Sequence, residues 1–437
     1  MIGKNKKSVF LFGSGASVLW NSPSTPELTE LVRNSGFKTT DNKLFITEFI
    51  FQKLVANGYE EADINFETII NVIEEWIVYY SQFDGEKKTS SLMGCFFTPC
   101  FDEEIFNFSI KGGVQKHGYQ LDIPKGSEYH FSKHANHNET PKQFFLQHLI
   151  AEILTNINAR ISKYAYHSAG HSVVDADTTE SKLFVKWMKK IASKSSLRLY
   201  TLNYDRVFKI LLERNDINIF EGFDCGEYID HSTWLRANVP KISFDVSSNV
   251  HYNLHGSAFW HVEAYDKDQL PNAEIFLTGA PVLPINDDHA ILQIERGKTI
   301  MLTNIVTGYQ KAQKSVLTPF KQMQAAFDRD CTFADDIYIL GYSLGDEHIN
   351  ETIKTAIRHN PTLKVTIVDP FFLKNNLDFQ MAIKLFPYKP TGYMKATSIS
   401  NKQHIFFDGA FILHTISFKE FLILQTDPRY IMHHPLK

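Results

Sequence analysis

Ser8-Val9-Phe10-Leu11-Phe12-Gly13-Ser14-Gly15 is the stretch of sequence that decides the fold. It is a short apolar run that stops at glycines, which is typical of a parallel strand buried on both faces. Glycines at such a strand end let the backbone turn tightly into the next segment. The stretch therefore predicts an α/β protein built on a Rossmann-like, doubly wound parallel sheet.

Strand signals return later in the chain and support the same fold class. The segment from Asp346 to Arg358 predicts a helix between the last two of these strands, which gives a β-α-β unit with a right-handed crossover. Residues 405–424 predict either a strand pair or a strand and a helix. The later strand signals are Leu197–Thr201, Val250–Leu254, Ile337–Gly341 and Val365–Asp369.

Apolar residues change to helical spacing in the region between the first strand and the second. This spacing is clear in Phe66–Tyr80, Phe144–Ile161 and Leu183–Ile191. We therefore expect a mainly helical insertion at residues 40–194, with irregular structure between residues 81 and 138. The sheet domain is expected at residues 1–39 and 195–437. Its first long helix is expected to begin at Thr25-Pro26-Glu27, an N-cap followed by a proline and an acidic first turn.

Composition excludes several classes of protein. Lys and Arg total 45 against 49 Asp and Glu, a formal net charge of -4 over 437 residues, so we expect no direct nucleic-acid binding. The four cysteines form no C-x-x-C pair, which fits a reducing, cytoplasmic location and argues against disulfides and a four-thiolate zinc site. The apolar run Val9–Phe12 is too short for a signal peptide or a membrane span, so no membrane association is expected. The cysteines are Cys95, Cys100, Cys225 and Cys331.

The glycine-rich strand end is the first candidate site. Gly13, Gly15, Ala16 and Ser17 would let the backbone approach a pyrophosphate at the start of a helix. The spacing is Gly-x-Gly-x-Ser rather than Gly-x-Gly-x-x-Gly, and no acidic residue ends a neat second strand, so an ordinary dehydrogenase is disfavoured. A tight turn that binds no ligand is an equally open interpretation.

Polar side chains follow the second predicted strand. Thr201, Asn203 and Asp205 lie where open α/β sheets place ligand-binding groups, and an amide and a carboxylate can hold a ribose hydroxyl, a carboxamide or a water. An Asx turn or a helix cap explains the same residue types.

Three further strand ends supply candidates. His255 is followed by Gly256, and a histidine with a pKa near ~6.5 is suited to act as a general base. Gly341 and Ser343 form a second small polar loop suited to a phosphate or ribose. Asp369 ends the last of the four strands. A histidine bonded to a backbone carbonyl, and a plain N-cap at Asp346, are the structural alternatives.

Other catalytic patterns are weak. His167 and His171 have the spacing of a helical metal pair, and His134 with His137 forms a second cluster, but the Glu of a zincin motif is missing and Gly170 weakens a helix. We therefore expect surface histidines and no metal. Ser17 and Ser257 lie outside any Gly-x-Ser-x-Gly elbow, which disfavours a serine hydrolase.

The ordered set of these segments resembles the sirtuin superfamily over residues 8–35 and 195–375. The matching motifs are the glycine-rich first loop, Thr-x-Asn-x-Asp at Thr201–Asp205, His255-Gly256, and Gly-x-Ser at Gly341–Ser343. The resemblance implies a sirtuin-like fold with NAD+ as the substrate. It further implies that Gly13, Gly15 and Ser17 hold the diphosphate, Asn203 holds the nicotinamide ribose or a water, Asp205 forms the carboxamide pocket, His255 is the base, and Gly341 and Ser343 line the adenosine side. Ala16, Thr201, Gly256 and Asp369 would complete the cofactor-binding set.

One departure refines this resemblance. The chain lacks the two cysteine pairs of the small zinc module that sirtuin deacylases generally carry. With a helical insertion and a C-terminal extension instead, it is similar to the sirtuin-like NAD hydrolases of bacterial antiphage defence. That resemblance implies an NAD+ glycohydrolase that gives nicotinamide and ADP-ribose without a metal, in a homo-oligomer or with a companion defence protein such as an ATPase or a nucleotide-sensing subunit. The alternatives are an NAD-dependent deacylase or ADP-ribosyl transferase, and a non-catalytic NAD or ADP-ribose sensor.

Overall fold

The computed structural model divides the chain into two compact units. The sheet unit comprises Met1–Ser22, Tyr164–Ser257 and Thr318–Lys437, and the helical unit comprises Pro23–Lys163 and Ala258–Leu317. The structure describes residues 6–80, 93–115, 118–124, 140–165, 167–168, 171–229, 232–264, 273–279, 291–295, 298–301, 303–306, 317–373, 384–385, 397–400 and 402–426.

An eight-stranded sheet forms the centre of the sheet unit, in the order β16-β17-β18-β15-β14-β1-β6-β9. The strands from β18 to β9 run parallel, and β16 and β17 pair antiparallel at one edge. The strands are β1 (Lys6–Phe12), β6 (Ser195–Thr201), β9 (Val250–Asn253), β14 (Asp336–Leu340), β15 (Lys364–Val368), β16 (Thr397–Ser400), β17 (Gln403–Phe406) and β18 (Phe411–His414).

The strand order identifies the fold class. The chain starts at β1 in the middle, adds β6 and β9 on one side, and then returns to add β14, β15 and β18 on the other. This is the 3-2-1-4-5-6 order of the Rossmann fold, whose direction of growth reverses between its first and fourth strands. The predicted α/β fold with a mostly parallel, Rossmann-like sheet is therefore confirmed. In such sheets the ligand binds at the carboxyl ends of the strands beside this reversal, which here lies between β1 and β14.

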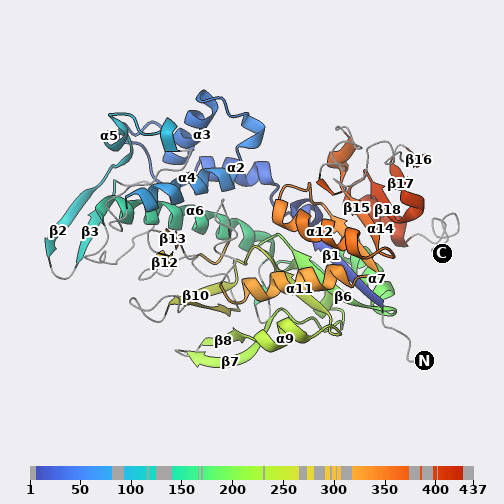
Figure 1. Ribbon diagram of the computed structural model, residues 1–437. Helices are drawn as coiled ribbons and strands as arrows, with labels where there is room; N and C mark the ends of the chain where they lie inside the picture. Colours follow the sequence, from blue (N-terminus) through green and yellow to red (C-terminus); the bar gives the residue numbers. More distant parts are fainter. Residues whose placement is uncertain are drawn as a thin grey trace. The chain divides into compact units, whose positions relative to one another are not determined.

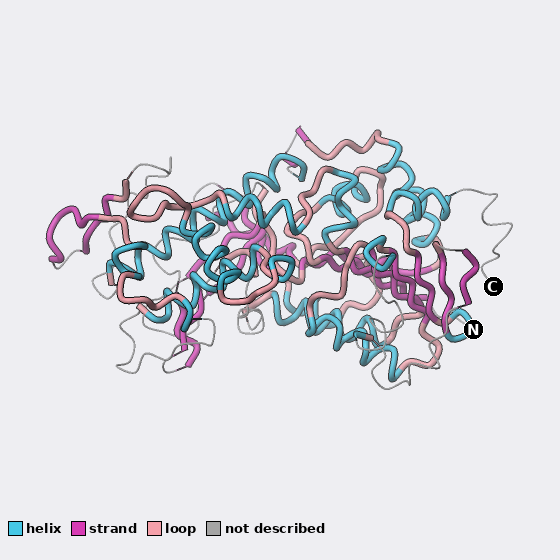
Figure 2. The backbone as a smooth tube through the Cα atoms, turned by 90° about the horizontal axis from the view of Figure 1, so that it is seen from above, coloured by secondary structure: helices cyan, strands magenta, loops and turns pink. Residues whose placement is uncertain are grey.

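Helices cover both faces of this sheet (Figures 1 and 2). On one face, the ring of Phe12 lies 4.0 Å from Phe208 and 6.4 Å from Phe418, centroid to centroid, and Phe10 lies 5.6 Å from Trp187. On the other, Tyr200 lies 4.8 Å from Phe327. The first face carries α7 (Thr179–Ala192), α8 (Val207–Glu213) and α14 (Phe418–Thr426), and the second carries α9 (Val239–Phe244), α11 (Phe320–Thr332) and α12 (Glu347–His359).

Burial on both faces explains why the first strand is apolar throughout. Val9, Phe10, Leu11 and Phe12 are all 0% exposed. Burial of one such side chain stabilises the fold by about 1.5–3 kcal/mol. The run therefore fixes both the position of β1 in the middle of the sheet and the attachment of helices on either side.

The turn after β1 differs from the expected loop and long helix. The chain enters one helical turn at once, α1 (Ser14–Ser17), and continues into the 3-10 helix η1 (Val18–Trp20). The predicted helix at Thr25 exists as α2 (Thr25–Arg33), but it belongs to the helical unit. Its N-cap is Ser24, one residue before the predicted Thr25, because Ser24 and Glu27 form a reciprocal capping box.

The helical unit contains the predicted helical segments up to Lys163. Its boundaries differ from the expected insertion in three ways: residues 23–39 lie in the helical unit, residues 164–194 with α7 lie in the sheet unit, and residues 258–317 lie in the helical unit. Part of the stretch expected to be irregular forms α5 and a hairpin. The elements are α2, α3 (Ile46–Ala56), η2 (Glu61–Asp63), α4 (Phe66–Tyr79), η3 (Met93–Cys95), α5 (Phe101–Ile105), β2 (Ser109–Gln115), β3 (Gly118–Asp122), most of α6 (Pro141–Ala165), β10 (Trp260–Ala264), β11 (Ala273–Leu277), β12 (Ile291–Glu295) and β13 (Lys298–Met301).

The remaining elements of the sheet unit lie outside its main sheet. The hairpin β4–β5 carries His167 and His171, so this pair does not lie on a helix; His134 and His137 fall outside the described residues. These elements are β4 (His167–Ser168), β5 (His171–Ser172), β7 (Phe223–Ile229), β8 (Ser232–Ala237), η4 (Pro370–Leu373) and η6 (Phe407–Gly409).

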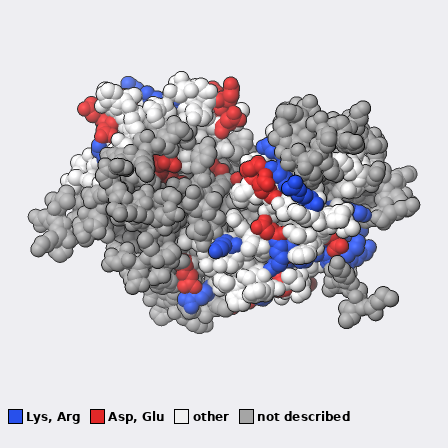
Figure 3. All heavy atoms as spheres, viewed as in Figure 1, with Lys and Arg blue, Asp and Glu red and all other residues white. Residues whose placement is uncertain are grey.

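Two global properties follow from the described residues. Among them, none of the helices is both long and apolar enough to span a membrane. On the face shown in Figure 3, the described acidic and basic side chains are interspersed, in line with the net charge of -4.

Candidate functional site

Every site residue predicted from the sequence lies in the sheet unit, at or just beyond the carboxyl end of a parallel strand. Parallel strands end at the same edge of a sheet, so these residues share one edge. Gly13, Gly15, Ala16 and Ser17 follow β1; Thr201, Asn203 and Asp205 end or follow β6; His255 and Gly256 follow β9; Gly341 and Ser343 follow β14; and Asp369 follows β15.

The two glycine loops lie against each other at the reversal point of the sheet. The Gly13 amide donates to the Leu340 carbonyl at 2.9 Å, and the Gly15 amide donates to the Gly341 carbonyl at 3.0 Å. A Cβ atom on Gly341 would lie 2.1 Å from the Ala16 nitrogen, and φ at Gly341 is +61°. The glycines are thus required for the contact between the loops. Gly15 is exposed, whereas Gly13 and Ala16 are buried.

Asn203 connects the β6 strand end to the first glycine loop. Its Nδ2 donates to the Gly13 carbonyl at 3.1 Å and to Oγ of Ser17. Its backbone amide donates to Oγ1 of Thr201 at 3.0 Å. Asn203 is 8% exposed, and Ser17 and Thr201 are fully buried. Ser17 and Thr201 therefore hold Asn203 in place, and the Ser17 hydroxyl is already engaged within the protein.

Asp205 is a buried part of the same network. Its Oδ2 accepts a hydrogen bond from the Tyr164 hydroxyl at 2.9 Å, and its Oδ1 accepts one from the Val207 amide at 3.0 Å. Burial raises the pKa of Asp205, and the bonds from Val207, Tyr164 and Ser17 offset part of that rise. The side chain is 0% exposed and holds the first turn of α8. Asp205 therefore supports the loop that carries Asn203, and its bond from the Val207 amide is the Asx turn of the structural alternative.

His255 reaches across the sheet edge. Its Nε2 lies 3.9 Å from Oδ2 of Asp346 at the start of α12. The parent strands, β9 and β14, are separated by β6 and β1. The loops after β9 and β14 therefore converge over the carboxyl ends of β6 and β1. Gly256 has φ +84°, a left-handed conformation that turns the chain directly after His255.

Ser343 and Asp369 differ in accessibility. Ser343 is exposed in the second glycine loop. Asp369 is 8% exposed, and its Oδ1 accepts a hydrogen bond from the Phe371 amide at 2.8 Å, which is an Asx turn. Burial raises the pKa of Asp369. Among the described residues, no three His, Cys, Asp or Glu side chains are grouped so that they could hold a metal ion.

Two supporting residues were missed from the sequence. Asn253 ends β9, and its Nδ2 donates to the carbonyls of both Asn203 and Asp205, at 2.9 and 3.0 Å. A polar residue at the end of an apolar strand was the signal that could have found it. Tyr164, the partner of Asp205, lies near the end of a long helix, where its sequence context gives no such signal.

The arrangement combines groups that suit ribose chemistry at one edge. It offers an amide at Asn203, an imidazole at His255 beside a carboxylate, and two glycine loops with exposed positions at Gly15 and Ser343. No protein-family model matches this chain, and no curated protein matches it. The chemistry of this edge is therefore the basis on which a function can be argued.

Proposed function

We propose that the sheet unit binds NAD+ and hydrolyses the bond between nicotinamide and the ribose. The observation that carries this proposal is the convergence of Asn203, His255 and both glycine loops at the carboxyl edge beside the reversal between β1 and β14. Dinucleotides bind at this position in Rossmann-like sheets. The order of the motifs, which resembles that of the sirtuin superfamily, supports NAD+ as the dinucleotide.

The chemical step suits the groups available. When the C1′–N bond breaks, its electron pair returns to the nicotinamide ring, which leaves as a neutral molecule. Positive charge develops on the ribose and is discharged when a water oxygen bonds to C1′. The water loses a proton in this step, so a base is needed. General-base catalysis accelerates such a step by roughly 10²–10⁴-fold. His255 would accept this proton, directly or through a ribose hydroxyl.

The remaining residues would position the substrate. Asn203 would hold the nicotinamide ribose or the attacking water, since its amide group is fixed by Gly13 and Ser17. Gly15 and Ser343 are the exposed members of the glycine loops and would lie along the diphosphate and the adenosine side. Asp205 and Asn253 would act indirectly, by holding the Asn203 loop.

The biological setting is part of the proposal. The resemblance to sirtuin-like effectors of antiphage defence suggests an enzyme that depletes NAD+ when it is triggered. Such an enzyme would act as a homo-oligomer or with a companion protein, and it would be silent before the trigger. Activity assays therefore need the protein alone and with its genomic-neighbour partner.

The test is release of nicotinamide and ADP-ribose from NAD+ by the purified chain. We expect Asn203→Ala and His255→Ala each to lower the rate by about 10²-fold or more, because each removes a group needed in the transition state. His359→Ala changes an exposed histidine at the end of α12 and serves as the matched control. Binding of NAD+ without release in every condition would favour a sensor, and release that survives His255→Ala would show that His255 is not the base.

A further inference from the structure

Asp346 is placed as a helix cap but does not act as one. It occupies the N-cap position of α12, yet its side chain makes no capping hydrogen bond. Its Oδ2 lies 3.9 Å from Nε2 of His255 instead. That distance exceeds a hydrogen bond, but opposite charges within about 4–6 Å stabilise each other strongly enough to alter protonation. The side chains are 4% exposed for His255 and 20% for Asp346, so water screens the pair only weakly.

The neighbouring ionisable groups on α12 are arranged differently. The ring of His348 lies 5.7 Å from the ring of His255, centroid to centroid, so a charge on His348 would oppose a charge on His255. Glu347 lies next to Asp346 in the chain, but its carboxylate pairs with Nζ of Lys354 at 2.6 Å. Glu347 therefore provides a matched control for Asp346.

We infer that Asp346 is a positioning residue for His255: its carboxylate orients the imidazole and stabilises the positive charge that the ring gains when it accepts a proton. In the reaction, an O–H bond of water or of a ribose hydroxyl breaks, and an N–H bond forms on the imidazole. The ring becomes cationic, and the negative charge of Asp346 compensates it. The part of this inference that concerns catalysis rests on the proposed function, whereas the pairing of the two side chains does not.

The pairing is tested on the protein without substrate. The ¹³Cε1 resonance of His255, assigned by its loss in His255→Gln, is followed by NMR as a function of pH in the full chain. Asp346→Asn keeps a residue that caps helices well and removes only the charge. We expect this variant to move the midpoint of the His255 titration to lower pH by about one unit. Glu347→Gln is expected to leave the midpoint unchanged. Asp346→Glu is expected to bring the midpoint back most of the way to the wild-type value.

An unchanged or raised midpoint in Asp346→Asn would overturn the inference. The kinetic counterpart is the pH profile of nicotinamide release: in Asp346→Asn, kcat should fall about tenfold with KM unchanged, and the acidic limb should move with the NMR midpoint. A shifted NMR midpoint without any nicotinamide release from the wild type would mean that the pair exists and the proposed hydrolase function fails. The two claims can therefore fail separately.

Discussion

Gly341 is the residue at which the two loops of the site approach most closely. A methyl group there would meet the backbone of Gly15 and Ala16, and the left-handed φ of +61° adds strain for any other residue. We expect Gly341→Ala to lower the free energy of unfolding by about 2–4 kcal/mol. Gly345→Ala is the control, because nothing lies within 4 Å of a Cβ atom at Gly345. Urea unfolding of both variants measures the difference, and equal stability would contradict the close approach.

Substitution of Tyr164 tests the buried hydrogen-bond network that holds Asp205 and the loop of Asn203. Burial raises the pKa of Asp205, and the Tyr164 hydroxyl, 2.9 Å from Oδ2, opposes that rise. Tyr164→Phe should therefore raise this pKa further and reduce the free energy of unfolding at pH 7 by about 1–3 kcal/mol.

The pH dependence of that loss has a definite sign. A raised pKa in the folded state means that ionised Asp205 costs stability; this cost starts to shrink as the pH falls through the folded pKa and is gone below the lower pKa of the unfolded state. The difference between Tyr164→Phe and wild type should therefore be largest at neutral pH and should shrink in acid. Tyr59→Phe, at a side chain that is 40% exposed, should show no such trend. A loss of unfolding free energy that does not change with pH would show that Tyr164 does not affect the ionisation of Asp205.

At the scale of elements, the parallel strands were the most predictable part of the fold. Their apolar runs reflect burial on both faces, which a sequence records directly, as in β1 and β14. The one-turn α1 was missed because Ser-Gly-Ala-Ser has neither length nor an apolar stripe. The hairpin β7–β8 was missed because residues such as Gly226 and Glu227 interrupt any alternation.

The candidate site was likewise only partly predictable from the sequence. Residues at strand ends, such as Asn203 and His255, could be named because the fold class places ligands there. Two nearby partners could not be named in advance: Tyr164, which bonds Asp205, and Asp346, which lies 3.9 Å from His255, are distant in sequence from those residues, and the contacts depend on how helices pack. The sequence also did not predict which residues of one loop are exposed: Gly15 is exposed, while Ser17, two positions later, is fully buried.

The first turn of α8 is held by a buried ion pair. Nε of Arg206 donates to Oε1 of Glu221 at 2.7 Å, and Nζ of Lys209 lies 2.9 Å from Oε2. Burial alone would raise the pKa of Glu221, but Arg206 and Lys209 lower it to about 2. Because Arg206 follows Asp205 directly, this pair also anchors the loop of the site.

Glu221→Gln should therefore reduce the free energy of unfolding at pH 7 by about 3–5 kcal/mol, since Arg206 would stay buried without its partner. A lowered folded pKa gives stability that is present above the unfolded pKa and is lost as the pH falls towards 2. The difference in free energy of unfolding between wild type and variant should thus become smaller as the pH falls from roughly 4.5 to 2. Glu213→Gln, at a pair whose carboxylate is 40% exposed, should cost less than about 1 kcal/mol. A difference that grows in acid would show that ionised Glu221 does not stabilise the fold.

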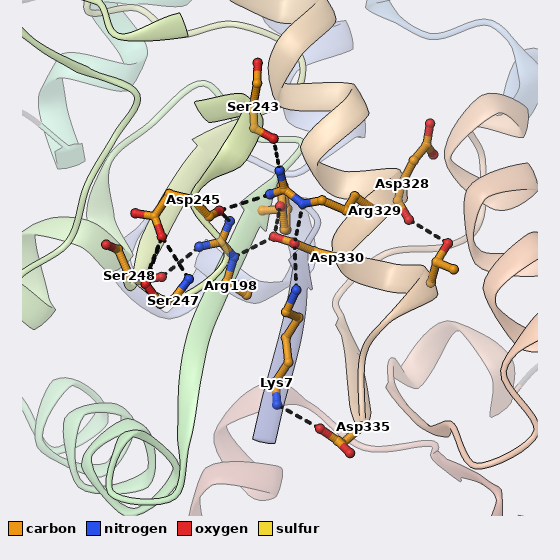
Figure 4. A network of polar contacts seen from close by, with 12 residues as sticks. Lys7, Arg198, Ser243, Asp245, Ser247, Ser248, Asp328, Arg329, Asp330 and Asp335 are labelled. Carbon is orange, nitrogen blue, oxygen red and sulfur yellow. Dashed lines mark hydrogen bonds and ion pairs between the residues drawn. The ribbon is translucent and has the colours of Figure 1, made fainter. Parts of the chain in front are cut away.

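At the scale of the sheet unit, a second charge network ties strands to helix α11 (Figure 4). Asp330 is fully buried and contacts Lys7 of β1 at 3.1 Å, Nε of Arg198 of β6 at 2.5 Å, and the Tyr200 hydroxyl at 2.6 Å. Arg198 also donates to the carbonyls of Ser248 and Asp245 before β9. Burial alone would raise the pKa of Asp330, but these cations and Tyr200 keep it lowered.

Asp330→Asn should destabilise this unit strongly. It would leave Arg198 buried without its carboxylate, which costs about 3–5 kcal/mol and would lower the midpoint of thermal unfolding. Asp328→Asn is the control, because Asp328 lies two positions earlier in the chain, is exposed, and accepts a hydrogen bond on its carboxylate from the Thr352 hydroxyl. Equal midpoints for the two variants would show that the network does not join the strands to the helix.

The proposed reaction is hydrolysis of NAD+ at the carboxyl edge of the sheet beside Asn203 and His255. The most direct measurement is mass spectrometry of the products formed from NAD+ in ¹⁸O-labelled water, with the genomic-neighbour partner present, for wild type and Asn203→Ala. We predict equal amounts of nicotinamide and ADP-ribose from the wild type, with one ¹⁸O in each ADP-ribose, and almost none from the variant. Intact NAD+ in all samples, or ADP-ribose formed equally by both proteins, would contradict hydrolysis at this site.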